Sequence, residues 1–160
     1  MENSKTRKLD RLDRKILQAL QSQGRLSYVE LAEQVGLSTS PCLERVKRLE
    51  RDGLITGYTA RLAADKLDAG LLVFVEISLN YTSDNVFNEF RQAVRQWPQI
   101  QECHLVSGDF DYLLKIRIAD MKAYRELLGE IVHVLPGVRD SRTLVAMETV
   151  KESCEIAIRI

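Results

Sequence analysis

Apolar side chains in the first 50 residues recur at intervals of three and four, the spacing of one face of an α-helix. Three such stripes follow one another, and Gly24 and Gly36 separate them. Their members are Leu9, Leu12, Ile16, Leu17 and Leu20, then Leu31, Ala32 and Val35, then Cys42, Leu43, Val46 and Leu49. The pattern predicts three short helices around a small common core.

The connection between the second and third stripes is a tight turn. Ser27 and Glu30 have the spacing of a capping box, which begins a helix over residues 28–35. Gly36 ends that helix because glycine readily takes a left-handed conformation, and Ser38 is placed to cap the next helix, about residues 39–51. Only a few residues separate the two helices, so they must cross at a steep angle.

The polar face of the third helix carries the candidate chemistry. Its first turn offers hydroxyls and free amides at the positive end of the helix dipole, where a phosphate or a base edge can bind. Arg45 and Arg48 lie one turn apart and can share one groove. The candidate DNA-contacting residues are Ser38, Thr39, Ser40, Pro41, Glu44, Arg45, Lys47, Arg48 and Arg51. Any amphipathic surface helix has a charged side, so it is the turn spacing that favours DNA.

After this helix, Asp52 and Gly53 interrupt the pattern, and residues 54–60 alternate around Gly57. This segment predicts a short hairpin, the wing of a winged helix-turn-helix domain over residues 1–60. Residues 61–70 have mixed character and predict a linker.

From residue 71 the hydrophobic period changes to the alternation of strands. The expected elements are a strand at 71–79, a helix capped by Asp84 and stopped at Pro98, strands at 100–106 and 112–118, a helix capped by Asp120, and a strand at 142–150. This order predicts an α+β chain whose second domain, residues 71–160, is a ferredoxin-like βαββαβ sandwich. One sheet face, with Leu72 and Phe74, would be bare and apolar in a monomer, which predicts dimerisation through it.

The loop between the two central strands contains Gly108, Asp109 and Asp111. Backbone amides beside a carboxylate suit a zwitterion, because an amino acid's carboxylate accepts from N–H groups while its ammonium pairs with an aspartate. One alternative is an ordinary hairpin loop in which aspartate accepts from turn amides. The other is a catalytic carboxylate pair, for which no nucleophile or metal ligand set lies nearby in the sequence.

Charge and cysteine usage narrow the class of protein. The net charge is zero, but residues 1–61 hold 12 Lys and Arg against 8 Asp and Glu, and the remainder holds 11 against 15, which suits one module that meets a polyanion. The dispersed Cys42, Cys103 and Cys154 predict reduced thiols with packing roles and no metal site. A polar start and no long apolar run predict a soluble, intracellular protein without a membrane span. No phosphate loop or catalytic motif is present, so no enzyme is expected.

Several segments along almost the whole chain match a known pattern. They are residues 37–38, 41–46 and 48–50 in the first half, 57–60 in the expected wing, 72–77 in the first strand, and most strongly 100–115. Together they resemble the Lrp/AsnC (feast/famine) family of bacterial and archaeal transcription regulators.

The resemblance implies a winged helix-turn-helix followed by an effector-binding βαββαβ domain. Such proteins are dimers that assemble into rings, tetramers or commonly octamers, and their amino-acid effector lies between dimers near the Gly-Asp loop. Carried over to this chain, the effector residues would be Leu105, Val106, Ser107, Gly108, Asp109, Asp111, Met121, Leu144, Val145 and Ala146. Leu144 stands where leucine-responsive members have an aromatic residue, a departure that bears on effector identity.

We therefore predict a homo-oligomeric, sequence-specific regulator of amino-acid metabolism. Its partners are double-stranded DNA, further copies of itself and a small amino-acid effector, leucine first and methionine second, with no other cofactor. One alternative is an architectural, nucleoid-type protein that compacts DNA with little sequence preference. Another is an enzyme or an enzyme-regulatory subunit built on the second half.

Overall fold

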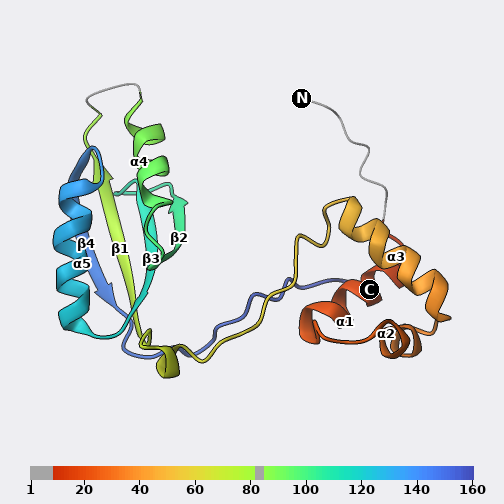
Figure 1. The fold of residues 1–160 in the computed structure, drawn as a ribbon. Coiled ribbons are helices and arrows are strands. Elements are labelled where there is room, and N and C mark those ends of the chain that lie inside the picture. The colour runs from red at the N-terminus through yellow and green to blue at the C-terminus, as the bar shows by residue number, and fades with distance from the viewer. Residues whose placement is uncertain (1–8, 82–84) are drawn as a thin grey trace. The chain divides into compact units, whose positions relative to one another are not determined.

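The computed structural model describes residues 9–81 and 85–160 (Figure 1). Its contacts divide the chain into two units, one of Met1–Arg61 with Glu152–Ile160 and the other of Leu62–Lys151. The second domain was expected to run to residue 160, whereas the last residues group with the first unit. The reason is a pair of hydrogen bonds: the Gln21 side-chain amide donates to the Ile156 carbonyl at 2.9 Å and accepts from the Ile156 N–H at 3.0 Å.

The first unit contains the three predicted helices. These are α1 Arg11–Ser22, α2 Tyr28–Val35 and α3 Thr39–Arg51. Each contributes its apolar stripe to one core, whose buried members are Ile16, Ala19, Leu31, Ala32, Val35, Cys42, Val46 and Leu49. The three-helix prediction is confirmed, and the core leaves the opposite side of α3 facing outward.

Local capping explains where these helices begin and end. Asp10 caps α1 by accepting from the Asp13 N–H at 2.8 Å. Both hydrogen bonds of the predicted capping box between Ser27 and Glu30 are present. Gly36 has φ 77° and ends α2 in the predicted left-handed conformation. Ser38 occupies the cap position of α3, but its side chain makes no capping hydrogen bond.

The predicted wing hairpin does not form in the described part of the chain, where residues 54–60 contain no strand. Each arm of such a hairpin would have only three residues, one arm before Gly57 and the other after it. An isolated two-stranded ribbon has only marginal stability in water. Two other contacts hold the segment instead. The Leu54 and Ile55 N–H groups donate to the Leu49 carbonyl at 2.9 and 3.2 Å, and the Tyr58 hydroxyl donates to Glu50 at 2.9 Å.

The second unit is an α+β sandwich with the predicted βαββαβ order. Its sheet has four antiparallel strands in the order β2-β3-β1-β4. The elements are the 3₁₀ turn η1 Ala64–Leu67, then β1 Leu71–Leu79, α4 Val86–Val94, β2 Ile100–Leu105, β3 Tyr112–Ile118, α5 Met121–Val134 and β4 Val138–Val145. The predicted cap of α4, Asp84, lies outside the described residues, while Asp120 caps α5 as predicted.

The last strand starts earlier than predicted. It was expected at 142–150, but β4 begins at Val138, paired with Leu79, and ends at Val145, paired with Val73. The turn at Pro136 and Gly137 brings the chain directly back to the end of β1, and the Asn80 N–H donates to the Gly137 carbonyl at 2.7 Å. The pairing of β4 with β1 therefore starts directly after this turn and ends near the first residues of β1.

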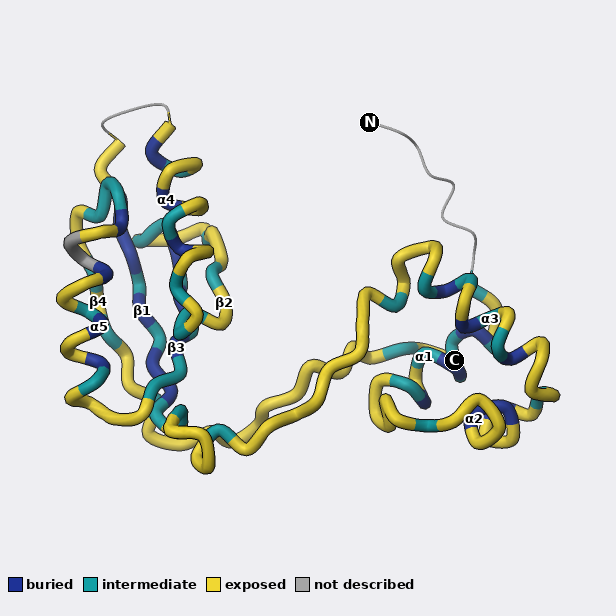
Figure 2. The backbone as a smooth tube through the Cα atoms, in the orientation of Figure 1, coloured by how far each residue is buried: buried dark blue, intermediate teal, exposed yellow. Residues whose placement is uncertain are grey.

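The two helices cover one face of the sheet, where the core lies (Figure 1). Buried segments run along the middle of the sheet in Figure 2. This core consists of Val73, Val75, Ile77, Leu79, Val86, Phe90, Val94, Tyr112, Leu114, Ile116, Tyr124, Leu127, Ile131 and Leu135. Alternate residues of β1, from Val73 to Leu79, thus lie on the buried face of the sheet, as the sequence predicted.

The other sheet face is less apolar than its β1 residues suggested. Phe74 lies between Lys115 and Leu144 in the neighbouring strands. Glu76 occupies the next row, and Lys115 pairs with Glu102 at 2.9 Å. The face combines apolar and charged side chains because its strands contribute different chemistry to each cross-strand row.

Candidate DNA-binding face and effector loop

The outer face of α3 presents one straight row of exposed side chains. At 3.6 residues per turn, the mean direction of this row is roughly 160° from that of the buried residues of α3. The row consists of Ser40, Glu44, Lys47 and Arg51, all exposed. Ser38, Thr39 and Pro41 are exposed at the start of the helix. Seven of the nine predicted DNA-contacting residues are therefore open to a partner.

Arg45 and Arg48 have a different environment. Arg45 Nη1 lies 2.6 Å from Asp10 Oδ2 and 2.7 Å from Asp13 Oδ1, and Arg48 Nη2 lies 2.6 Å from the same Asp13 oxygen. Both arginine side chains are 23% exposed, and that of Asp13 is 6% exposed. The prediction that both arginines share a groove stays a prediction, since both are already engaged by α1.

This ion-pair cluster shifts the pKa values of Asp10 and Arg45. The pKa of Asp10 is lowered, first by the hydrogen bond from the Asp13 N–H and then by that from Arg45. The pKa of Arg45 is raised by its hydrogen bonds to Asp10 and then Asp13. Asp10 and Asp13 were not predicted as functional residues, because no local pattern links them to side chains 32 to 35 positions later in the chain.

The Gly108 loop is fastened to the end of β1 by Asp111. Its Oδ2 accepts from the Leu79 N–H at 2.7 Å, and its Oδ1 accepts from the Tyr81 hydroxyl. The latter contact raises the pKa of Tyr81. The hairpin-loop interpretation thus describes Asp111, which accepts from a backbone amide, while Asp109 is exposed. Gly108 has φ 147°, in a region that favours glycine.

A single chain brings the predicted effector residues together in two separate groups. Residues 105–111 lie at the end of the sheet where Ile77 pairs with Tyr112. Residues 144–146 lie beside the other end of β1, where Val73 pairs with Val145, and Met121 follows β3 at that end. Ile77 lies four residue steps along β1 from Val73, so about 13 Å separates their rows. One chain cannot close an amino-acid site from both groups.

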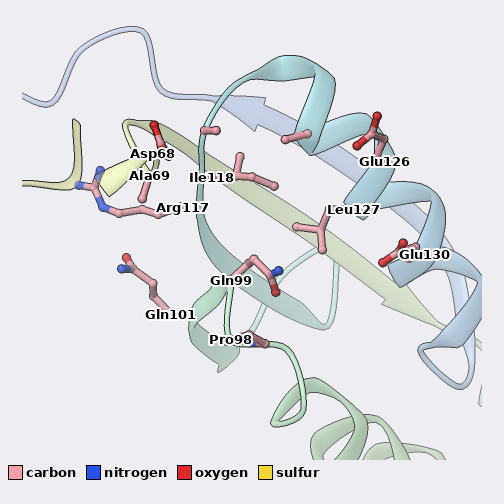
Figure 3. A pocket seen from close by; sticks show the side chains of 12 residues that line it. Asp68, Ala69, Pro98, Gln99, Gln101, Arg117, Ile118, Glu126, Leu127 and Glu130 are labelled. Carbon is pink, nitrogen blue, oxygen red and sulfur yellow. The ribbon is translucent and has the colours of Figure 1, made fainter. Parts of the chain in front are cut away.

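Two hollows of the second unit share only Leu105 with the predicted effector set. One of about 570 Å³ lies between the η1 turn, the start of β2 and α5 (Figure 3), and none of the predicted residues lines it. Its wall includes Gln99, whose Oε1 is buried without a hydrogen-bond partner. A second hollow, of about 420 Å³, includes Leu105 and Tyr112.

Other expectations can be compared with the described residues. All three cysteines are free. Cys42 is buried and Cys103 is half-buried, so packing roles fit both. Cys154 is exposed, and the predicted packing role was wrong for it. Burial raises the pKa of Cys103. Within residues 9–81 and 85–160, no helix is long and apolar enough for a bilayer. Among the side chains that the structure describes, His, Cys, Asp and Glu form no group suited to a metal ion.

Two family profiles match the two halves of the chain. The Winged helix-turn-helix DNA-binding profile matches residues 9–56, and the Lrp/AsnC ligand binding domain profile matches residues 72–156. The chain belongs to the Lrp/AsnC family. This confirms the resemblance and the two-domain fold class, and it makes the chain a transcription regulator with a DNA-binding helix-turn-helix and a ligand-binding domain, and not an enzyme.

Relatives within the Lrp/AsnC family cover nearly the whole chain. The leucine-responsive regulatory proteins of Klebsiella pneumoniae and Escherichia coli are each 62% identical over 151 residues, 94% of this chain and 92% of theirs. A solved transcriptional regulator from Neisseria meningitidis, in complex with L-Met, is 35% identical with a TM-score of 0.89 over 94% of this chain and 97% of its own. An AsnC family regulator from Agrobacterium tumefaciens has the same TM-score at 36% identity, over 93% and 97%.

Proposed function

We propose that this Lrp/AsnC regulator binds the major groove through the outer face of α3 and responds to leucine or methionine bound between subunits. The observation that carries the DNA part is the exposed row of α3, which projects directly away from the three-helix core. The second helix of a helix-turn-helix enters the major groove with such a face. The proposal places the protein in the bacterial cytoplasm, on the nucleoid.

The effector part is supported by relatives and by the sheet. The relatives at 62% identity are leucine-responsive by name, and the Neisseria meningitidis neighbour was solved with L-Met. In this chain the Gly108 loop and the group with Met121 and Leu144 lie at opposite ends of β1. A site that uses both groups must take one from each of two subunits, which supports an effector bound between copies.

Assembly follows from the same requirement. The open sheet face, with Phe74 half-buried and Leu144 39% exposed, offers apolar surface for a first dimer contact. The exposed Leu105 and Met121, at opposite ends of the sheet, then suit contacts between dimers in a tetramer or octamer ring. An effector held between dimers changes DNA affinity only through its different affinities for the assembly states, a coupling of about 1–3 kcal/mol in typical cases.

Thermal unfolding of the purified protein against each of the twenty amino acids tests the effector. A ligand at about one hundred times its dissociation constant adds about 2.7 kcal/mol to the free energy of unfolding. We expect a rise in melting temperature with leucine or methionine and none with glycine. Sedimentation with and without that ligand then tests assembly. A flat panel, or a monomer at micromolar concentration, would contradict the proposal.

A further inference from the structure

The groove-facing row of α3 contains one carboxylate among its polar and cationic side chains. Glu44 lies between Ser40 and Lys47 in this row and is exposed. None of the described residues forms a hydrogen bond or an ion pair with its carboxylate. The side chain is exposed, so a binding partner can reach it. An unpaired negative charge thus stands at the centre of the face that the proposed function turns toward DNA.

Asp10 and Asp13 hold the two arginines nearest to Glu44 on α3 away from its carboxylate. Glu44 and Arg48 have the i, i+4 spacing at which glutamate and a cation usually pair on a helix. Here Arg48 Nη2 bonds Asp13 Oδ1 at 2.6 Å, and Arg45 bonds both Asp10 and Asp13. The two arginines are turned toward α1, so neither neutralises Glu44. The cluster leaves this carboxylate available.

A carboxylate in a groove opposes binding on most sequences. Phosphates repel it, and the base acceptors that line the major groove repel it as well. The exception is a base amine. Cytosine presents its N4 amine without an adjacent acceptor of its own, whereas adenine places the N7 acceptor beside its N6 amine.

We propose that Glu44 determines sequence preference by accepting a hydrogen bond from the N4 amine of a cytosine in each half-site. This inference rests on the proposed docking of α3 and specifies what that face recognises. Lys47 and Arg51, in the same row, attract the duplex whatever its sequence, and Glu44 restricts tight binding to sites that carry the cytosine. Without such a cytosine the carboxylate is desolvated and unsatisfied.

Binding-site selection from a random pool of duplexes tests the inference with the full-length protein. The variants are Glu44→Gln and Glu44→Ala, with Glu33→Ala as the matched control, because Glu33 is an exposed carboxylate on α2. We expect wild type to select cytosine at one position of each half-site. Glu44→Gln should select adenine there, because glutamine accepts from N6 and donates to N7.

Dissociation constants on the selected site and its single-base variants supply the magnitude. Wild type should discriminate roughly 5- to 10-fold at the cytosine position, the lower part of the range for base contacts. Glu44→Ala should lose that preference, keep the others, and bind random duplex more tightly than wild type. Glu33→Ala should keep every preference.

The outcomes separate this inference from the proposed function. A selected site whose preferences are all unchanged in Glu44→Ala overturns the role of Glu44 and leaves DNA binding by α3 intact. Binding by wild type without any preference overturns the inference and favours an architectural protein. Absence of binding to any duplex overturns the proposed docking, and the inference with it.

Discussion

Replacing Asp13 should destabilise the first unit and leave the second unchanged, so that the two units unfold at different temperatures. The Asp13 carboxylate is 6% exposed and accepts from Arg45 and Arg48 at 2.7 and 2.6 Å. Asp13→Ala removes both charge-assisted hydrogen bonds, each worth about 1.5–3 kcal/mol in proteins. Loss of one partner of a fully buried pair would cost about 3–5 kcal/mol.

The expected loss is below that sum. Both arginines are 23% exposed and can turn partly to water, and Arg45 keeps Asp10 as a partner. We expect the free energy of unfolding of the first unit to fall by about 2–3 kcal/mol. For a unit of this size each kcal/mol corresponds to roughly 4–8 °C in melting temperature.

Two spectroscopic signals distinguish the units. The single tryptophan, Trp97, lies in the second unit, so its fluorescence reports that unit alone, whereas far-ultraviolet circular dichroism reports the helices of both. Asp13→Ala should move the circular dichroism transition of α1, α2 and α3 to lower temperature and leave the Trp97 transition in place. The matched control is Asp52→Ala, because Asp52 pairs with Arg51 at 3.4 Å on the surface, and we expect a loss under about 1 kcal/mol.

If Asp13→Ala changes neither transition, the ion-pair cluster of Asp13 with Arg45 and Arg48 does not stabilise the first unit. An equal shift of both transitions would refute the independence of the two units. Freed arginines should also raise the dependence of DNA affinity on salt by as much as about two counterions. Unchanged salt dependence would mean that Arg45 and Arg48 do not reach phosphates after release.

The other predictions concern the groove face, the loop and acid stability. Lys47→Ala and Arg51→Ala should each weaken binding to all duplexes alike and lower the salt slope by about one, measured by fluorescence anisotropy. Asp111→Ala should abolish the thermal response to the effector while DNA affinity persists, because it releases the loop from the Leu79 N–H. The pKa of Glu30 is lowered, first by its backbone hydrogen bond from Ser27. Its contribution to stability is therefore present above its unfolded-state pKa and lost as the pH falls through its folded-state pKa, so Glu30→Gln should flatten the acid limb of stability against pH.

Each of these has a contradicting outcome. A loss confined to one sequence would make Lys47 or Arg51 a base contact. Equal loss of DNA binding and effector response in Asp111→Ala would contradict the division of labour between the units. An acid limb as steep in Glu30→Gln as in wild type would show that the capping box does not contribute to acid unfolding.

Most of the secondary structure was accessible from the sequence because the forces that define it act within about four residues. The Ser27–Glu30 capping box, the left-handed Gly36 and the Asp120 cap all use neighbours along the chain. Hydrophobic period then identified the core stripes of α1, α2 and α3. The family followed from the residues themselves, since longer segments such as 100–115 carry its pattern.

Tertiary structure decided which of the candidate side chains are available. In the sequence, Glu44, Arg45 and Arg48 belong to one charged face, and only the packing of α3 against α1 places Asp13 beside the two arginines and leaves the glutamate unpaired. The sheet likewise decided that residues 105–111 and 144–146 lie at opposite ends of β1. Helical period and capping depend on residues close together in the sequence. The contact between Asp13 and Arg48, 35 residues apart, depends on how the formed helices pack, and no local sequence pattern specifies that packing.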